Sequence, residues 1–294
     1  MACIDIKGLN KSYGSKVVLK DINIKIEENK IYGLLGRNGA GKTSLLNLIT
    51  DRIIKDSGSI KIDGEEVHEN DKALEKIYFM TEKTLYPDDY KVKDVFKWTK
   101  EFYPNFDNKY ALELSKKFGL DINTKIKGLS TGYASICKII TTLASNTEIM
   151  IYDEPILGLD ANHRELFYKE LMANYIKNPK TIILSTHIIE EVSNLLEQVI
   201  IVNEGKIITS KEAEQLLENA YTVSGISENI DKYIESKEIV NIETMAAFKS
   251  ATVIGSVRSS DRELAESLDL KFSKVELQKL FIYLTENNTM KGEA

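Results

Sequence analysis

Residues 36–44 read Gly36-Arg37-Asn38-Gly39-Ala40-Gly41-Lys42-Thr43-Ser44. This stretch follows the short apolar run 31–35 and opens into residues 45–49, where apolar residues have helical spacing. The order of strand, G-x-x-x-x-G-K-T and helix predicts a phosphate-binding loop. Its glycines let backbone N–H groups turn toward an anion, and the helix start adds further donors. A plain glycine turn between two core elements is the alternative interpretation.

Each part of this loop has an expected role in binding a nucleoside triphosphate. Lys42 is expected to reach the β- and γ-phosphates, and the Thr43 hydroxyl is expected to ligate Mg²⁺. The predicted nucleotide-binding residues are Gly36, Arg37, Asn38, Gly39, Ala40, Gly41, Lys42, Thr43 and Ser44.

The composition narrows the classes of protein that fit. The 294 residues are 43% hydrophobic, which is enough for one large domain or two small ones. A formal net charge of −6 argues against a nucleic-acid partner bound mainly through its phosphates. The two cysteines, Cys3 and Cys137, are far apart in the sequence and lack metal-ligand spacing, so neither a disulfide framework nor a zinc site is expected. Such sparse cysteine use is typical of a reducing compartment. No segment has the roughly 18 apolar residues of a membrane span, so we expect a soluble chain that another protein holds at any membrane.

The chain is expected to contain two kinds of sheet. Residues 2–30 and 58–64 are expected to form antiparallel strands, because apolar residues such as Ile22, Ile24 and Ile26 alternate with polar ones. Apolar runs at 77–80, 149–152 and 181–184 are expected to be strands of a second sheet. A helical segment, 162–176, lies between the last two runs. Strand, helix and strand in this order predict an α/β fold with a parallel sheet.

Three further regions complete the expected organisation. Helical spacing from about residue 90 to 145 predicts a helical subdomain over about 84–145. A hairpin is predicted at 199–208. Residues 218–294 show a β-α-β-β-α-β-α pattern, which predicts a small α+β domain of ferredoxin-like order. The predicted domains are therefore 1–217 and 218–294.

Two adjacent carboxylates, Asp153 and Glu154, follow the apolar run 149–152. Because the carboxyl ends of parallel strands line the ligand crevice, both are expected beside the glycine-rich loop. Asp153 is suited to holding Mg²⁺ through water, and Glu154 to polarising the water that attacks the γ-phosphate. A solvated Asp-Glu loop is the alternative interpretation.

A second candidate anion site lies at Leu129-Ser130-Thr131-Gly132-Tyr133, before a helical run at 136–143. Ser130 is suited to cap that helix, and Gly132 leaves its first turn open to an anion. By itself such a pattern is more often a plain helix cap than a ligand site.

Together these segments resemble the nucleotide-binding subunits of ATP-binding cassette (ABC) transporters, over residues 1 to about 215. The family's Walker A loop, signature motif and Walker B strand are matched in the right order. Gly158-Leu159-Asp160 matches the D-loop, His187 the switch histidine, and Tyr13 the aromatic residue that stacks on adenine. Without the resemblance, Tyr13 would be interpreted as a turn residue and His187 as a locally bonded helix-start histidine.

The resemblance implies a P-loop NTPase fold with a RecA-like parallel core, an antiparallel β subdomain and a helical subdomain. It implies ATP and Mg²⁺ as cofactors, and a second cassette whose signature motif completes the ATP site from the other side. The implied catalytic residues are Glu154, His187 and Lys42. Further nucleotide contacts are implied for Tyr13, Ser130, Gly132 and Asp160, and metal contacts for Thr43, Glu82 and Asp153.

Two departures from the family pattern stand out. Glu82 occupies the position that usually holds glutamine, which adds negative charge near the phosphates. The signature reads Leu-Ser-Thr-Gly-Tyr instead of Leu-Ser-Gly-Gly-Gln, so Thr131 and Tyr133 add bulk at the expected dimer seam. Ser130 and Gly132 are retained, and altered coupling or a specialised partner is expected rather than inactivity.

A single cassette with a C-terminal tail resembles the ATPases of bacterial exporters of the bacitracin and phenol-soluble modulin type. This implies export of a peptide, antibiotic or similar amphiphile, and partners that are membrane permease subunits and a second cassette, identical or different. It also implies a cytoplasmic chain, peripheral on the inner face of the cell membrane. Two alternatives remain: a catalytically weak cassette of a heterodimeric pair, and a soluble ABC ATPase acting on ribosomes or DNA.

Overall fold

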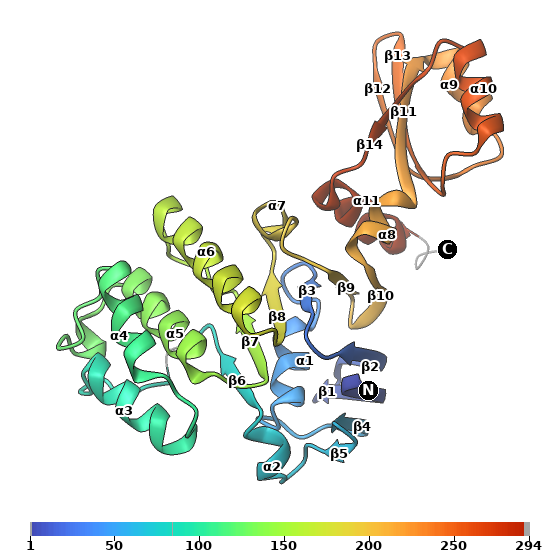
Figure 1. The fold of residues 1–294 in the computed structure, drawn as a ribbon. Helices are drawn as coiled ribbons and strands as arrows, with labels where there is room; N and C mark the ends of the chain where they lie inside the picture. The colour runs from blue at the N-terminus through green and yellow to red at the C-terminus, as the bar shows by residue number, and fades with distance from the viewer. Residues whose placement is uncertain (1, 84, 291–294) are drawn as a thin grey trace. The chain divides into compact units, whose positions relative to one another are not determined.

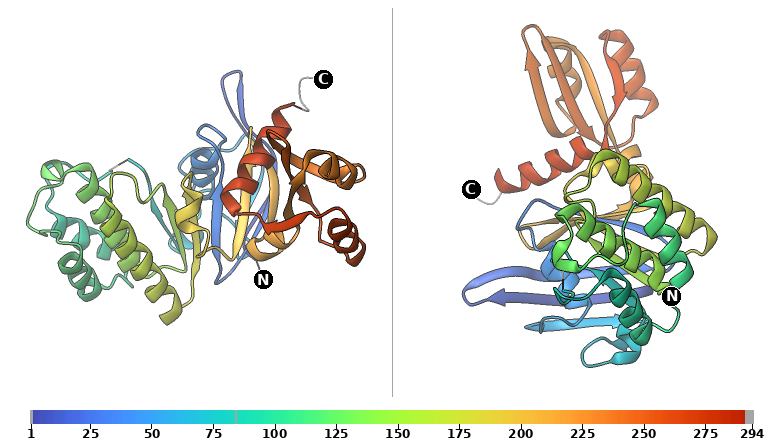
Figure 2. Two further views of the ribbon diagram at one scale, coloured as in Figure 1. Left: turned by 90° about the horizontal axis from the view of Figure 1, so that it is seen from above. Right: turned by 90° about the vertical axis from the view of Figure 1, so that its left-hand side faces the viewer.

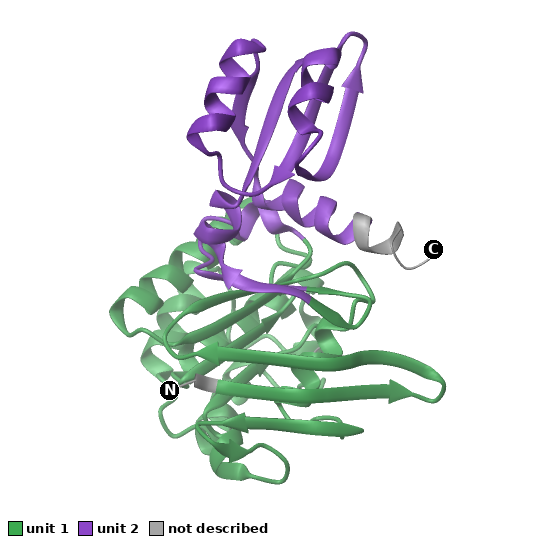
Figure 3. Ribbon diagram, turned by 90° about the vertical axis from the view of Figure 1, so that its right-hand side faces the viewer, with its two compact units in different colours: residues 1–187, 202–207 green, residues 188–201, 208–294 purple. Residues whose placement is uncertain are grey.

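The computed structural model describes residues 2–83 and 85–290. Its contacts divide the chain into two compact units, drawn in different colours in Figure 3. Unit 1 comprises Met1–His187 and Val202–Ile207, and unit 2 comprises Ile188–Ile201 and Ile208–Ala294. The limits at residues 1, 84 and 294 in the sequence analysis lie outside the described residues.

Unit 1 is built on four parallel strands that lie side by side. Their order is β3 (Ile31–Leu35), β8 (Thr181–Thr186), β7 (Ile149–Asp153) and β6 (Ile77–Met80). Every residue of these strands is buried, which explains why they read as nearly unbroken apolar runs. The predicted parallel sheet is confirmed.

Two helices follow strands of this sheet and carry the chain back along it. Helix α1 (Lys42–Ile49) begins after the glycine-rich turn that follows β3, and α6 (Ala161–Lys177) joins β7 to β8 (Figure 1). The carboxyl ends of β3, β7 and β8 therefore meet at one edge of the sheet, where α/β proteins bind their ligands.

A second, antiparallel sheet of unit 1 has the strand order β2-β1-β4-β5. Its strands are β1 (Ala2–Tyr13), β2 (Lys16–Glu27), β4 (Ser57–Ile62) and the short β5 (Glu65–Glu66). The long strands run beside one another in the views of Figure 2. Ile22, Ile24 and Ile26 are buried while their neighbours on β2 are exposed, as their alternation predicts. The short helix α2 (Asp71–Leu74) follows this sheet.

Three helices of unit 1 lie together in the region predicted to be helical (Figure 1). They are α3 (Val92–Phe102), α4 (Asn108–Lys117) and α5 (Thr131–Ser145), with a 3-10 turn at Ile126–Gly128. Val92, Val95, Phe96 and Thr99 form the buried face of α3, at the spacing expected from the sequence. Helix α5 begins directly after Ser130, so the fold places the signature turn at the start of a buried helix.

The second half of unit 2 is an α+β domain, as predicted. It runs through β11 (Ala220–Ile226), α9 (Ser227–Ile234), β12 (Glu238–Met245), β13 (Phe248–Ile254), α10 (Ser259–Ser267) and β14 (Lys271–Lys274). The antiparallel strands have the order β12-β13-β11-β14, the order of a split β-α-β fold. Val223, Ile230, Tyr233 and Ala251 belong to the hydrophobic core of this domain.

The remaining elements of unit 2 lie on either side of this domain in sequence. They are α7 (Ile189–Val192), most of the hairpin β9 (Gln198–Asn203) and β10 (Lys206–Glu212), α8 (Ala213–Glu218) and the last helix, α11 (Leu277–Met290). Helix α11 packs against α7 and α8. These contacts group α7 and α8 with the C-terminal domain, whereas the sequence analysis places the boundary at 217/218.

The tip of the β9–β10 hairpin belongs to unit 1 and supports the glycine-rich turn. The Gly205 N–H donates to the Ala40 carbonyl at 3.1 Å, and the Lys20 N–H donates to the Gly205 carbonyl at 2.8 Å. Gly205 has φ +73°, and a Cβ there would lie 2.3 Å from the carbonyl oxygen of Val18. Only glycine fits this position, because any side chain would collide with backbone.

A Gly205→Ala substitution is therefore expected to lower the free energy of unfolding by more than about 2 kcal/mol, since it adds a backbone clash to left-handed strain. Gly64→Ala is the matched control. Gly64 has φ +89° but open space around the added Cβ, so only strain of about 1 kcal/mol is expected there. Urea titration followed by circular dichroism measures both changes. Equal losses in the two variants would show that the close approach at Gly205 is not what makes glycine necessary.

Candidate active site

The glycine-rich turn borders a cleft of about 550 Å³ in unit 1. The residues that line it come from β2, the turn after β3, α1, the segments after β6 and β7, and the β9–β10 turn. They are Lys16, Val17, Val18, Arg37, Asn38, Gly39, Gly41, Lys42, Thr43, Ser44, Glu82, Glu154, Glu204 and Gly205. Most of the predicted nucleotide-binding residues are thus brought to one cleft, while Gly36 and Ala40 are buried beneath it.

The Lys42 side chain folds back against the glycine-rich turn and contacts its backbone carbonyls. Its side chain is buried, and its ammonium donates to the Gly36 carbonyl at 2.6 Å and to the Arg37 carbonyl at 3.4 Å. The Glu154 carboxylate lies 4.0 Å away. Burial lowers the pKa of the Lys42 ammonium. A cation with this little solvent around it is a strong partner for phosphate oxygens that enter the cleft.

Thr43 and Asp153 meet at the floor of the same region. The Thr43 hydroxyl donates to Asp153 Oδ2 at 2.9 Å. Asp153 is almost fully buried, and burial raises the pKa of its carboxyl. The buried hydroxyl of Ser185 interacts with this carboxyl and counters the rise in its pKa, while among the described residues no hydrogen bond of normal geometry reaches Asp153 Oδ1. A buried carboxylate oxygen without a donor fits a site for a hard cation.

The protein supplies only part of such a cation's coordination shell. The parts of the chain that the structure describes hold no group of three or more His, Cys, Asp or Glu side chains able to bind a metal. The oxygen atoms of Thr43, Asp153 and the cleft-lining Glu82 fit Mg²⁺, which is commonly held by one or two carboxylates and by substrate phosphates.

Glu154 and His187 form the second polar pair of the site. Glu154 directly follows β7, has φ +49°, and donates its N–H to the Ser185 carbonyl at 2.9 Å. This turn directs its carboxylate so that Oε2 lies 2.9 Å from Nδ1 of His187, which follows β8. Strands β7 and β8 are neighbours in register, so the two side chains meet because of the sheet. A carboxylate at the cleft held by a histidine is suited to act as a general base toward water.

Besides Gly36 and Ala40, four predicted nucleotide contacts, Tyr13, Ser130, Gly132 and Asp160, do not line this cleft. Tyr13 ends β1 opposite Lys16 and leaves half of its surface exposed, with the Lys11 ammonium 5.2 Å from its ring. Ser130 caps α5 by accepting the Tyr133 N–H at 3.3 Å, and Asp160 caps α6. Ser130, Gly132 and Asp160 thus lie outside the lining of the cleft that contains Lys42.

The sequence model of the ABC transporter family matches residues 19–157. The lantibiotic transport ATP-binding protein SrtF of Streptococcus pyogenes is 32% identical over 71% of this chain and 90% of its own length. The chain belongs to the ATP-binding proteins of ABC transporters.

Other relatives extend this result. The ABC transporter ATP-binding protein YtrB of Bacillus subtilis is 29% identical over 73% of this chain and 74% of its own length. The linearmycin resistance ATP-binding protein LnrL of the same species is 27% identical and covers 96% of this chain and 98% of its own length, so the likeness includes unit 2. A solved ATP-binding subunit of an ABC transporter has the same fold, with a TM-score of 0.66 at 19% identity over 73% of this chain and 91% of its own length.

The predicted ABC ATPase fold is thus confirmed, and the chain is an ATP-binding and ATP-hydrolysing cassette. No helix in residues 2–83 and 85–290 combines the length and hydropathy that crossing a bilayer requires.

Sequence reasoning missed a buried cation beside the site of this cassette. Lys138 on α5 is buried, and its ammonium donates to the carbonyls of Thr81 at 3.0 Å and Glu82 at 2.5 Å. Burial lowers the pKa of the Lys138 ammonium, while the negative charge of Glu82 opposes that change. The added charge of Glu82 therefore has a nearby cation. The sequence around Lys138 does not predict this role, because the hydrogen-bond partners of Lys138 lie 56 and 57 residues away.

A Lys138→Met variant is expected to bind Mg-ATP about tenfold more weakly, because the Glu82 segment loses the ammonium that holds it beside the cleft. Lys180→Met is the matched control. Lys180 is also buried and donates to Asn146 at 2.5 Å, but Asn146 does not line the cleft, whereas Glu82, the partner of Lys138, does. Its loss is expected to lower the melting temperature while leaving the Mg-ATP dissociation constant unchanged. Calorimetric titration measures the Mg-ATP dissociation constant of each variant. Equal weakening in the two variants would contradict a specific role for Lys138.

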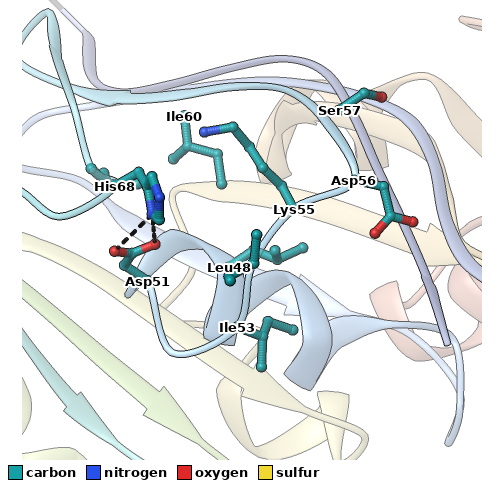
Figure 4. Close-up of a pocket in the computed structure, with 10 residues that line it drawn as sticks. Leu48, Asp51, Ile53, Lys55, Asp56, Ser57, Ile60 and His68 are labelled. Atoms are coloured by element: carbon teal, nitrogen blue, oxygen red, sulfur yellow. Dashed lines mark hydrogen bonds and ion pairs between the residues drawn. The ribbon is translucent and has the colours of Figure 1, made fainter.

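A separate hollow of about 240 Å³ lies between the end of α1 and the antiparallel sheet (Figure 4). Leu48, Ile53 and Ile60 form its apolar part, and His68 at its rim is 3.1 Å from Asp51. None of the residues lining it belongs to the nucleotide cleft, so it is a different feature from the ATP site.

Proposed function

We propose that this cassette powers a bacterial exporter and that two copies of it hydrolyse Mg-ATP at shared sites, each formed between the two copies. The chain would act on the cytoplasmic face of the membrane, bound to permease subunits that are separate chains. The exported compound would be a peptide, an antibiotic or a similar amphiphile. The names of SrtF and LnrL, which refer to lantibiotic transport and linearmycin resistance, support this class of cargo.

One observation carries the shared-site proposal: the turn that is expected to complete a nucleotide site does not line the cleft that contains Lys42. In the proposal, that cleft is one half of a site. The other half is the turn with Ser130 and Gly132, which does not line that cleft and leaves Ser130 exposed. A two-fold pair of copies joins each cleft to the partner's turn and completes two equivalent sites.

The chemistry at each shared site follows from the described contacts. Lys42 and the backbone N–H groups of the glycine-rich turn bind the phosphates, and Tyr13 offers an exposed ring to the adenine. Glu154, held by His187, accepts a proton from the attacking water. Mg²⁺ held by Thr43 and Asp153 would neutralise charge on the phosphates.

Hydrolysis then removes the ligand that joins the two copies. A ligand that binds only the joined state stabilises it by mass action, and its loss lets the pair open. In the proposal, opening and closing of the pair is passed to the permease subunits through the region of α3, α4 and α5. This couples ATP turnover to transport without any contact between the cassette and the cargo.

The shared site can be tested by mixing two inactive variants. Lys42→Met removes the phosphate cation from the cleft, and Ser130→Arg blocks the turn that caps a partner's phosphate. Each variant alone is expected to be inactive, because both of its sites are damaged. In a mixed pair, one site joins an intact cleft to an intact turn. An equal mixture is therefore expected to recover up to about a quarter of the original activity, since half of the pairs are mixed.

Recovery on mixing would support shared sites, because neither chain contains an intact site. An ATPase rate in the mixture equal to the mean of the two separate rates would contradict them. Unaltered activity of Ser130→Arg alone would contradict any role for the turn.

A further inference from the structure

His163, in the first turn of α6, contacts aromatic rings from two other helices of unit 1. Its ring stacks on Phe118, at the end of α4, with a centroid distance of 6.2 Å and an interplanar angle of 11°. The ring of Tyr133, in the first turn of α5, approaches His163 edge-on at 6.1 Å and 66°. Tyr133 is the residue at which the signature departs from the family's glutamine, so this departure is matched by a ring on another helix.

The same histidine is bound to the D-loop carboxylate. The backbone N–H of His163 donates to Asp160 Oδ1 at 2.9 Å, and the ring Nδ1 lies 3.0 Å from Asp160 Oδ2. The hydrogen bond from this backbone N–H is also the main reason why the pKa of the Asp160 carboxyl is lowered. His163 thus lies between Tyr133 of the signature turn and Asp160 of the D-loop.

The backbones of these two segments are packed together as well. The Ser135 hydroxyl donates to the Leu157 carbonyl at 3.0 Å. A Cβ on Gly132 would lie 2.7 Å from the Gly158 carbonyl oxygen, so the backbones of the two segments are in contact at this point. Gly158 itself has φ +80°, which turns the D-loop back toward α5.

The exposure of these side chains separates this cluster from the core. Tyr133 is 37% exposed, and the side chains of His163 and Asp160 are 26% and 63% exposed. The cluster joins two surface segments instead of filling the interior. Rings in contact hold their segments more tightly than the same area of flexible side chains does.

We propose that His163 is a positioning residue that fixes the signature turn 130–133 to the D-loop 158–160, so that both reach a partner cassette as one rigid surface. The identity of that partner rests on the function proposed above. The rigid link between the two segments does not depend on that proposed function, because every contact in it lies within one chain. Altering one segment must therefore loosen the other in the isolated protein.

Hydrogen–deuterium exchange of the full chain without nucleotide tests this link. Tyr133→Ala is expected to speed exchange in peptides covering 156–165 by about two- to tenfold, although the substituted residue lies on another helix. His163→Ala is expected to speed exchange by a similar factor in peptides covering 128–136. Trp98→Ala is the matched control, since Trp98 is a half-exposed ring of α3 that contacts Tyr90 and Phe102. It should leave both segments unchanged.

His163→Phe separates the two halves of the link. The phenyl ring retains the contacts with Phe118 and Tyr133 but loses the contact of the ring Nδ1 with Asp160 Oδ2, so that only the backbone N–H bond to Asp160 Oδ1 remains. Peptides covering 128–136 should then stay protected, while those covering 156–165 exchange faster. Unchanged exchange at 156–165 in Tyr133→Ala, or an equal change in Trp98→Ala, would overturn the proposal.

A second measurement connects the link to assembly. In a Glu154→Gln background, His163→Ala and Tyr133→Ala are each expected to raise the protein concentration for half-maximal ATP-dependent dimerisation several-fold. If the two residues act through each other, the double variant should need no higher protein concentration for half-maximal dimerisation than the more strongly affected single variant. Additive losses would contradict the link. Failure of the Glu154→Gln parent to dimerise would count against the proposed function alone, because the exchange result still decides the link.

Discussion

A Glu154→Gln variant is expected to hydrolyse ATP at least about a hundredfold more slowly than the unaltered chain while binding ATP with similar affinity. The Glu154 carboxylate lies beside His187 at 2.9 Å and near Lys42 at 4.0 Å, at the cleft that holds the phosphates. Glutamine retains the size and a hydrogen bond to the histidine, but it cannot accept a proton from water. A coupled-enzyme ATPase assay measures the rate, and a fluorescent ATP analogue measures binding.

Glu148→Gln removes the same charge from the residue before β7 and serves as the control. Glu148 is well exposed, and its carboxylate lies 3.9 Å from the Lys76 ammonium, so its loss should leave the rate unchanged. Hydrolysis by Glu154→Gln at half the original rate or more would rule out Glu154 as the base.

A Lys42→Met variant is expected to lose measurable hydrolysis and to bind ATP at least about tenfold more weakly, because the phosphates lose their buried cation. Its fold should be retained. Methionine has nearly the length of the lysine side chain, and burial already disfavours the ammonium, as its lowered pKa shows. A melting temperature within a few degrees of the original, together with lost ATP binding by calorimetry, is the expected result.

Lys16→Met tests whether any positive charge at the cleft has this effect. Lys16 also lines the cleft, but it is exposed, so water and salt screen its charge. Its loss should weaken ATP binding by no more than about threefold. Equal losses in Lys16→Met and Lys42→Met would show that Lys42 has no special place in the site.

Much of this architecture can be predicted from the sequence, because local patterns encode it. Ile149–Asp153 and Ile31–Leu35 read as apolar runs since both faces of their sheet are covered. The glycine-rich turn identifies the cleft, since its conformation needs glycine at fixed positions. Parallel strands end at one shared edge of the sheet, which is why the sequence alone predicts Asp153 and Glu154 beside Lys42.

Contacts between distant segments cannot be predicted in this way. Lys138 lies inside a helix pattern, and only the packing of α5 against the segment after β6 brings it to Glu82. Gly205 has the sequence context of a turn residue, but its hydrogen bond to Ala40 depends on how the hairpin meets the loop. The contact between Tyr133 and His163 joins two helix starts that share no local pattern. Such contacts depend on tertiary packing, which carries no periodic mark in the sequence.

The most direct test of the account is the mass of the Glu154→Gln protein in solution, measured by light scattering without nucleotide, with Mg-ADP and with Mg-ATP. If two copies complete each other's sites, the protein should be monomeric in the first two conditions and should double its mass only with Mg-ATP. A protein that binds Mg-ATP and stays monomeric would contradict pairing of identical copies and would indicate a different cassette as the partner.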